Sequence, residues 1–201
     1  MASETSIHRG RGAEMFLYTG QERNTIPRDV IHVRFDPSAS VTAIPDRAFF
    51  EHRKMEEVEL CEGLQEIGDS AFYDCRALKR FTIPSTVIRI GEFAFAFVRS
   101  TLSIHLPDGV ESIGQYTFGC GEFTYFRIPP LITTIPEGVF CRCECMFSLE
   151  LPESTREIED DAFSGCHSLR NLAIPPNAET EEDSFKSCSD LQQLFGSEVQ
   201  I

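Results

Sequence analysis

The chain has 201 residues, 41% of them hydrophobic, which is enough for one core of ordinary size. Its formal net charge of −14 argues against nucleic acid as a partner, because such binding depends on basic side chains that neutralise phosphates. No apolar run approaches the ~20 residues that a membrane span needs. The N-terminal region contains no apolar stretch typical of a secretory signal, so we expect an intracellular protein, either cytoplasmic or nuclear.

Residues 1–29 are expected to form a leader that caps the rest of the chain. Within the leader, the apolar stretch M-F-L-Y at 15–18 is a strand candidate. Stacked repeats expose an apolar rim unless something covers it, so we expect this stretch to cover the first repeat. At the far end, a tail at 196–201 follows the last repeat, which predicts no second cap and allows end-to-end self-association through the last coil.

Residues 30–195 form an array of repeats with a period of 22 or 23 residues. Isoleucine and proline keep the same period as phenylalanine, which marks a repeat architecture. The phenylalanines predicted to stack as a ladder through the core are Phe49, Phe72, Phe95, Phe118, Phe140, Phe163 and Phe185.

Each repeat contains a short strand followed by proline. The stretch 81–83 alternates apolar, polar and apolar side chains, as a strand with one buried face does. Its counterparts lie at 33–35, 58–60, 104–106, 126–128, 149–151 and 172–174. After the strand, glycines at 68, 91 and 114 would permit a tight bend, and the A-F-x-x-C stretch would form one helical or 3₁₀ turn. We therefore predict a β-rich α/β solenoid of about seven coils with one parallel strand in each.

The stretch I-G-D-S-A-F-Y-D-C-R-A-L-K-R-F-T-I-P-S-T-V at 67–87 resembles the BspA-type leucine-rich repeat. The resemblance covers about residues 30–195. It implies a right-handed leucine-rich-repeat solenoid with the parallel strands on its concave face, and it implies protein binding as the usual function.

The cysteines follow the repeat. Cys75, Cys143, Cys166 and Cys188 come three residues after a ladder phenylalanine and Cys120 comes two after, so we expect small buried thiols in a packed column. The C-x-C-x-C pattern at 141–145 invites a metal interpretation, but its spacing differs from the usual C-x₂₋₄-C pair. We expect no metal site.

No catalytic motif stands out. The sequence contains no Gly-rich phosphate loop, no G-x-S-x-G and no H-E-x-x-H. We therefore predict a non-enzymatic scaffold that binds a protein partner and needs no cofactor. Two alternatives stay open: an extracellular or cell-surface adhesion module of microbial type, and a regulatory part of a larger enzyme.

The alternating strand residues face the predicted concave surface. Arginine and tyrosine are enriched in binding hot spots, so the partner site is placed where they gather. The alternative is that these are ordinary solvated strand residues. The predicted partner-binding residues are Arg80, Thr82, His105, Tyr125, Arg127 and Glu150.

Overall fold

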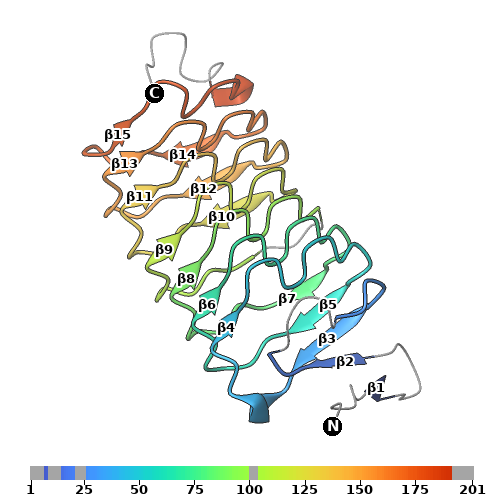
Figure 1. Cartoon of the computed structure of the whole chain (residues 1–201). Coiled ribbons are helices and arrows are strands. Elements are labelled where there is room, and N and C mark those ends of the chain that lie inside the picture. Colours follow the sequence, from blue (N-terminus) through green and yellow to red (C-terminus); the bar gives the residue numbers. More distant parts are fainter. Residues whose placement is uncertain (1–6, 9–14, 21–25, 100–103, 192–201) are drawn as a thin grey trace.

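The computed structural model describes residues 7–8, 15–20, 26–99 and 104–191 (Figure 1). These form a parallel-strand solenoid in which each coil stacks on the one before it, and the described N-terminal and C-terminal strands lie at opposite ends of the stack. The solenoid that the sequence predicts is confirmed. Among the described residues, no helix is long and apolar enough to cross a membrane.

The strands form two rows (Figure 1). The first row comprises β2 (Met15–Tyr18), β3 (His32–Phe35), β5 (Glu57–Glu59), β7 (Arg80–Phe81), β10 (Tyr125–Arg127), β12 (Ser148–Glu150) and β14 (Asn171–Ala173). The second row comprises β4 (Ala43–Ile44), β6 (Glu66–Ile67), β8 (Arg89–Ile90), β9 (Ser112–Ile113), β11 (Thr134–Ile135), β13 (Glu157–Ile158) and β15 (Glu179–Thr180). A short β1 (Ile7–His8) pairs antiparallel with β2, and a 3₁₀ helix covers Pro37–Ala39.

The first row occupies most of the predicted strand positions. Within it, β2 pairs in parallel with β3, with Phe16 opposite Val33 and Tyr18 opposite Phe35. Tyr18 is fully buried, and its ring centroid lies 5.3 Å from that of Phe49. The stretch 15–18 therefore lies at the N-terminal side of the first coil, while the division into leader, repeats and tail stays a prediction. The stretch 104–106 carries no strand, so the first row divides into two sheets there, and the second row divides separately between β9 and β11.

The second row is a feature that the sequence analysis missed. We predicted one strand in each coil, with a bend after it, but a two-residue strand ends at the recurrent isoleucine. Its inward residues are buried, as Ile44 and Ile67 show, and in register with each other. The signal was present in the sequence as the alternation of polar residue and isoleucine, but two residues are too few for a confident strand pattern.

The glycines after the second strand are needed for close approach and not for a bend. None of Gly68, Gly91 and Gly114 has a positive φ. A Cβ atom added to Gly91 would lie 2.7 Å from the backbone nitrogen of Asp69 in the preceding coil. The backbones of neighbouring coils therefore meet at this corner, which only a residue without a Cβ allows at these positions.

The A-F turn is a series of tight turns, not the helical turn that the sequence suggested. Residues two before and two after the ladder phenylalanine are left-handed, with Ser70 at φ 53° and Asp74 at φ 58° on either side of Phe72. This alternation directs every second N–H to the next coil: the Phe72 nitrogen donates to the Ala94 carbonyl at 2.8 Å. Hydrogen bonds between coils thus continue through the turn.

The phenylalanine ladder forms the centre of the core. Phe49 and Phe72 stack with ring centroids 5.1 Å apart and planes 4° from parallel. The stacking continues to Phe185, where the last step is 5.1 Å. Six of these seven rings are completely inaccessible and the last is 6% exposed. Stacking like on like lets each coil bury the apolar side that it could not bury alone.

Candidate protein-binding face

The six predicted binding residues all lie on the exposed side of the first row or of the segment at 104–106. We call this side the strand face. Arg80 belongs to β7, Tyr125 and Arg127 to β10, and Glu150 to β12. Their outward orientation follows from strand alternation, because Phe126 between the two β10 residues is buried.

The structure divides these residues into two groups. Arg127 stands opposite Glu150 in the β10–β12 register. Arg80 belongs to the preceding sheet, which ends at β7, and its register partner is Glu57. The predicted face is therefore two neighbouring charged surfaces and not one continuous sheet.

The N-terminal part of the strand face is a charged row across three strands. His32 Nδ1 lies 3.1 Å from Glu57 Oε2, and an Arg80 guanidinium nitrogen lies 2.7 Å from the same oxygen. The hydrogen bond from Arg80 lowers the pKa of Glu57, aided by His32 and opposed by partial burial. An open groove of about 290 Å³ lies beside this row, lined by Glu57, Glu59, Glu62, Arg80 and Thr82 among others. The sequence analysis did not include His32 in the site, although its 25-residue distance from Glu57 is close to the period.

The C-terminal part of the strand face combines an aromatic ring with charges. Tyr125 is 38% exposed, and burial of part of its ring together with the Glu150 carboxylate raises its pKa. An Arg127 guanidinium nitrogen lies 2.7 Å from Asp108 Oδ1. One strand further on, Asn171 Nδ2 donates to Ser148 Oγ at 3.2 Å. This surface offers both donors and acceptors on a sheet whose backbone is already paired.

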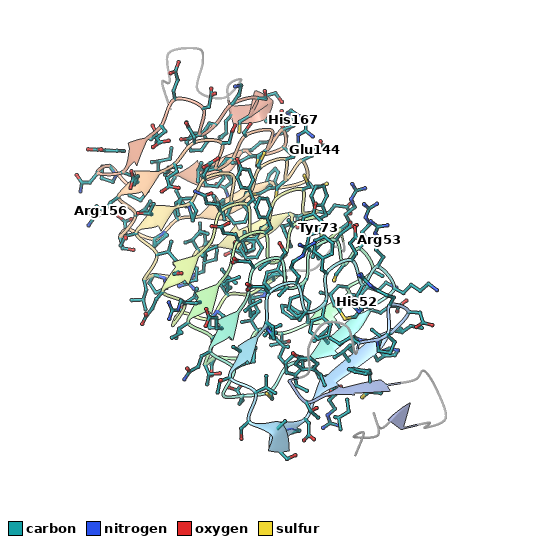
Figure 2. The ribbon with its side chains drawn as sticks, in the orientation of Figure 1. His52, Arg53, Tyr73, Glu144, Arg156 and His167 are labelled. Carbon is teal, nitrogen blue, oxygen red and sulfur yellow. The ribbon has the colours of Figure 1, made fainter. Side chains whose placement is uncertain are left out.

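The A-F turns of successive coils form one edge of the solenoid, which we call the turn edge, and its polar side chains differ from those of the strand face. His52, Arg53, Tyr73, Glu144 and His167 lie along this edge, opposite Arg156 on the second-row edge (Figure 2). The Asp74 carboxylate is 4% exposed and binds both Arg53, at 2.7 Å, and Arg76. Burial alone would raise the pKa of Asp74, but these two guanidinium groups outweigh it and the pKa is lowered. This cluster ties neighbouring turns together and points to no ligand.

His52 is buried in the position that cysteine occupies in other coils. Burial lowers the pKa of the His52 imidazole, which favours its neutral form. Its ring packs edge-on against Phe49, with centroids 5.8 Å apart. Since the ring is inaccessible, we assign it to packing rather than to acid–base chemistry.

The structure contains the predicted column of buried cysteines, but with four cysteines instead of the expected five. Cys75, Cys143, Cys166 and Cys188 are fully buried, and each thiol donates to the carbonyl of the ladder phenylalanine in the preceding coil, as in the 3.2 Å contact of Cys75 with Phe49. Burial raises the pKa of these thiols well above the ordinary value. Cys120 is not in the column, because Gly121 occupies that position and Cys120 is only partly buried. Within the described part of the chain, no group of three histidine, cysteine or acidic residues could hold a metal ion.

The two strand rows, the aromatic ladder and the thiol column define a leucine-rich-repeat solenoid. The model of the BspA type leucine rich repeat region matches residues 31–145 and 112–199, in six copies. This chain therefore belongs to the BspA-type leucine-rich repeat family. No curated protein matches it.

Solved structures of bacterial proteins share the fold. A leucine-rich repeat protein from Bacteroides ovatus is 32% identical, with a TM-score of 0.71, over 74% of this chain and 39% of that one. The leucine rich repeat protein of T. pallidum is 23% identical, with a TM-score of 0.73, over 96% of this chain and 91% of that one. This chain thus spans about two fifths of the B. ovatus protein but nearly all of the T. pallidum one.

The expected intracellular location is wrong. The BspA-type family and a similar structure, a leucine rich cell surface protein from Faecalibacterium prausnitzii, point to extracellular or surface proteins. That structure is 24% identical over 81% of this chain and 58% of that one, with a TM-score of 0.56. The absence of an N-terminal signal pattern was therefore a poor guide to the compartment. The family indicates a role in protein interaction or adhesion.

Proposed function

We propose that this chain is a non-enzymatic scaffold of the cell surface or extracellular space that binds a protein partner through its strand face. The observation that supports the proposal is that exposed polar side chains project from a rigid backbone on this face. All six predicted residues are exposed, while the strands that bear four of them are fixed by parallel pairing and a buried aromatic core. A rigid surface loses little conformational entropy when it binds, which favours affinity.

The arginines on this face can exchange their present partners for those of another protein. Arg80 pairs with Glu57 and Arg127 with Asp108, and the two arginine side chains are 64% and 48% exposed. Exposed ion pairs contribute only about 0–1 kcal/mol, so breaking them costs little. A carboxylate on a partner, placed where water is excluded, would bind either guanidinium more strongly.

The test is site-specific photocrosslinking combined with matched variants. A photoreactive phenylalanine replaces Tyr125 on the strand face, or Arg89 on the second row as the control position, and the whole protein is exposed to extracellular and cell-surface proteins. Crosslinked partners are identified by mass spectrometry and then purified for a binding titration. We expect a specific adduct from position 125 and none from position 89.

The titration compares Arg80→Ala with Arg127→Ala, made together, against the control pair Arg89→Ala with Arg142→Ala. We expect the first pair to weaken binding at least tenfold, the second pair to leave it unchanged, and both to melt close to the parent. Equal weakening by both pairs, or an adduct from position 89 alone, would assign binding to another face.

A further inference from the structure

Within the described part of the chain, the second row has one seam, where the strand ladder between neighbouring coils is open. In the second row, the sheet that starts at β4 ends at β9, and a new sheet starts at β11. Elsewhere the backbone nitrogen after the second strand donates to the preceding coil, as from Gly114 to Ile90 at 2.8 Å and from Glu159 to Ile135 at 3.0 Å. Pro136 occupies this position at the seam and has no N–H to donate to Ile113.

The neighbouring bonds of the row are missing at the same place. In other coils the Glu111 nitrogen donates to Ile88 at 2.9 Å and the Arg156 nitrogen to Thr133 at 2.7 Å, but within the described chain no such bond joins Thr133 to Glu111. An open groove of about 420 Å³ lies here, with Ser112, Thr133 and Pro136 among its lining residues. The first row is also interrupted here. The coil on the N-terminal side of the seam has no strand at 104–106, so the row is open between β7 and β10.

The turn edge therefore carries most of the backbone hydrogen bonding across the seam. Three bonds cross it there: from Tyr116 to Glu137 at 3.0 Å, from Phe118 to Val139 at 2.9 Å, and from Cys120 to Cys141 at 2.7 Å. The last bond joins the backbones of two cysteines. Extended backbones joined side by side by hydrogen bonds lie about 4.7–4.9 Å apart. That separation lies within the range of about 4.4–6.8 Å that a disulfide accepts.

These two thiols differ from the thiols of the buried column. Both are partly exposed, and among the described residues neither donates to a phenylalanine carbonyl as the column thiols do. Burial raises the pKa of the Cys141 thiol, and the charges of Asp161 and of the neighbouring Cys120 raise it further. Cys120 also lines a groove of about 280 Å³ together with Arg99, Arg142 and Cys145, so a small reagent can reach its sulfur.

We propose that Cys120 and Cys141 form a disulfide that fastens the two coils across the open seam. The Cys120 thiolate attacks one sulfur of a small-molecule disulfide, which releases one thiol and leaves a mixed disulfide on Cys120. The Cys141 thiolate then attacks the Cys120 sulfur and displaces the second small thiol. Two protein thiols are oxidised, the reagent is reduced to two thiols, and the two protons that the cysteines lose go to those thiols. In the organism this step rests on the surface location proposed above, where the environment is oxidising.

Tryptic peptide mapping tests the assignment on the full chain in vitro, independently of location and partner. Trypsin cleaves after Arg99, Arg127, Arg142 and Arg156, so Cys120, Cys141 and the pair Cys143 and Cys145 fall in three separate peptides. The reduced protein is incubated with oxidised glutathione at mildly alkaline pH, blocked with an alkylating reagent and digested without reduction. We expect peptide 100–127 joined to peptide 128–142. Peptide 100–127 joined to 143–156, or only glutathione adducts, would overturn the proposal.

Variants and stability complete the test. Cys141→Ser should abolish the joined peptide and Cys145→Ser should leave it intact. Closing a loop of about 20 residues predicts that oxidation raises the melting midpoint by roughly 6–12 °C in the parent and in Cys145→Ser, but not in Cys141→Ser. An unchanged midpoint in the fully crosslinked parent would show that the bond does not fasten the seam. A crosslink in a chain whose strand face binds nothing would leave this proposal standing while the binding proposal falls.

Discussion

Replacing Phe118 by alanine tests whether the aromatic ladder holds the stacked coils together. Phe118 is fully buried between Phe95 and Phe140, with ring centroids 5.7 and 5.5 Å away. Phe126 and Phe123 contact the same ring at 4.8 and 5.9 Å. Truncation removes the buried ring and leaves a cavity that the fixed neighbouring coils cannot close, so we expect a loss of about 3–5 kcal/mol in the free energy of unfolding.

Phe185→Ala is the matched control, because it changes the same residue type in the same ladder. Phe185 is 6% exposed, and among the described rings it contacts only Phe163. Three fewer ring contacts, at about 0.5–1.5 kcal/mol each, predict that the control loses at least ~1.5 kcal/mol less than Phe118→Ala. Phe118→Leu should lose less stability than Phe118→Ala, since leucine refills part of the cavity.

Urea unfolding, followed by circular dichroism and by tyrosine fluorescence, measures these losses in a chain that contains no tryptophan. For a chain of this length, the Phe118→Ala loss corresponds to a fall of roughly 6–20 °C in the melting midpoint. Equal losses at Phe118 and Phe185, or a loss below ~1 kcal/mol at Phe118, would refute the view that central rings carry the stability of the stack.

Three further predictions concern the corner, the buried thiols and the buried carboxylate. Gly91→Ala should cost about 1–3 kcal/mol in urea unfolding, because its Cβ would lie 2.7 Å from the Asp69 nitrogen, whereas Gly109→Ala, with its nearest contact at 3.8 Å, should be nearly neutral. In native protein, alkylation monitored by mass spectrometry should modify exposed Cys145 quickly and Cys75 only after unfolding; equal rates would contradict the packing of the column. The pKa of Asp74 is lower in the folded chain, so its contribution to stability is present above about pH 4 and is lost as the pH falls through the folded value. Asp74→Asn should therefore reduce the fall in the free energy of unfolding at acid pH. An unchanged slope on the acid side would show that Asp74 does not contribute to this pH dependence.

The periodic part of the fold could be predicted from the sequence because stacking repeats each contact in every coil. A residue such as Phe72 meets the same neighbour types above and below, so one period fixes its burial and its stacking. The second row and the left-handed turn could not be predicted in this way. Phe93 and Phe97 are aromatic residues at φ 53° and 60°, a conformation that their side chains disfavour and that only the hydrogen bonds to the next coil explain.

The exposure of the side chains on the strand face was predictable from the sequence, but their ion pairing was not. Alternation along each strand gives the outward side of Arg80 and Arg127 correctly. The Arg80–Glu57 pair spans 23 residues and follows from the period, whereas the Arg127–Asp108 pair spans 19 and does not. Asp108 lies after the strand segment in a loop, so its reach to Arg127 depends on loop geometry that repeats do not encode.

The open seam shows how one residue type can interrupt a repeat without breaking the stack. A shortened step alone does not open the row: the step from Phe163 to Phe185 is one residue short, like the step from Phe118 to Phe140, yet β13 and β15 pair because the Glu181 nitrogen donates to Ile158 at 3.0 Å. Pro45 also follows a strand of this row, but that strand is β4, the first described strand of the row, so no described strand precedes it. Among the described residues, only Pro136 combines the missing N–H with a strand of the row in the coils on both sides. The ladder is lost on that side of the solenoid, and the turn edge with Cys120 and Cys141 is left to join the two halves.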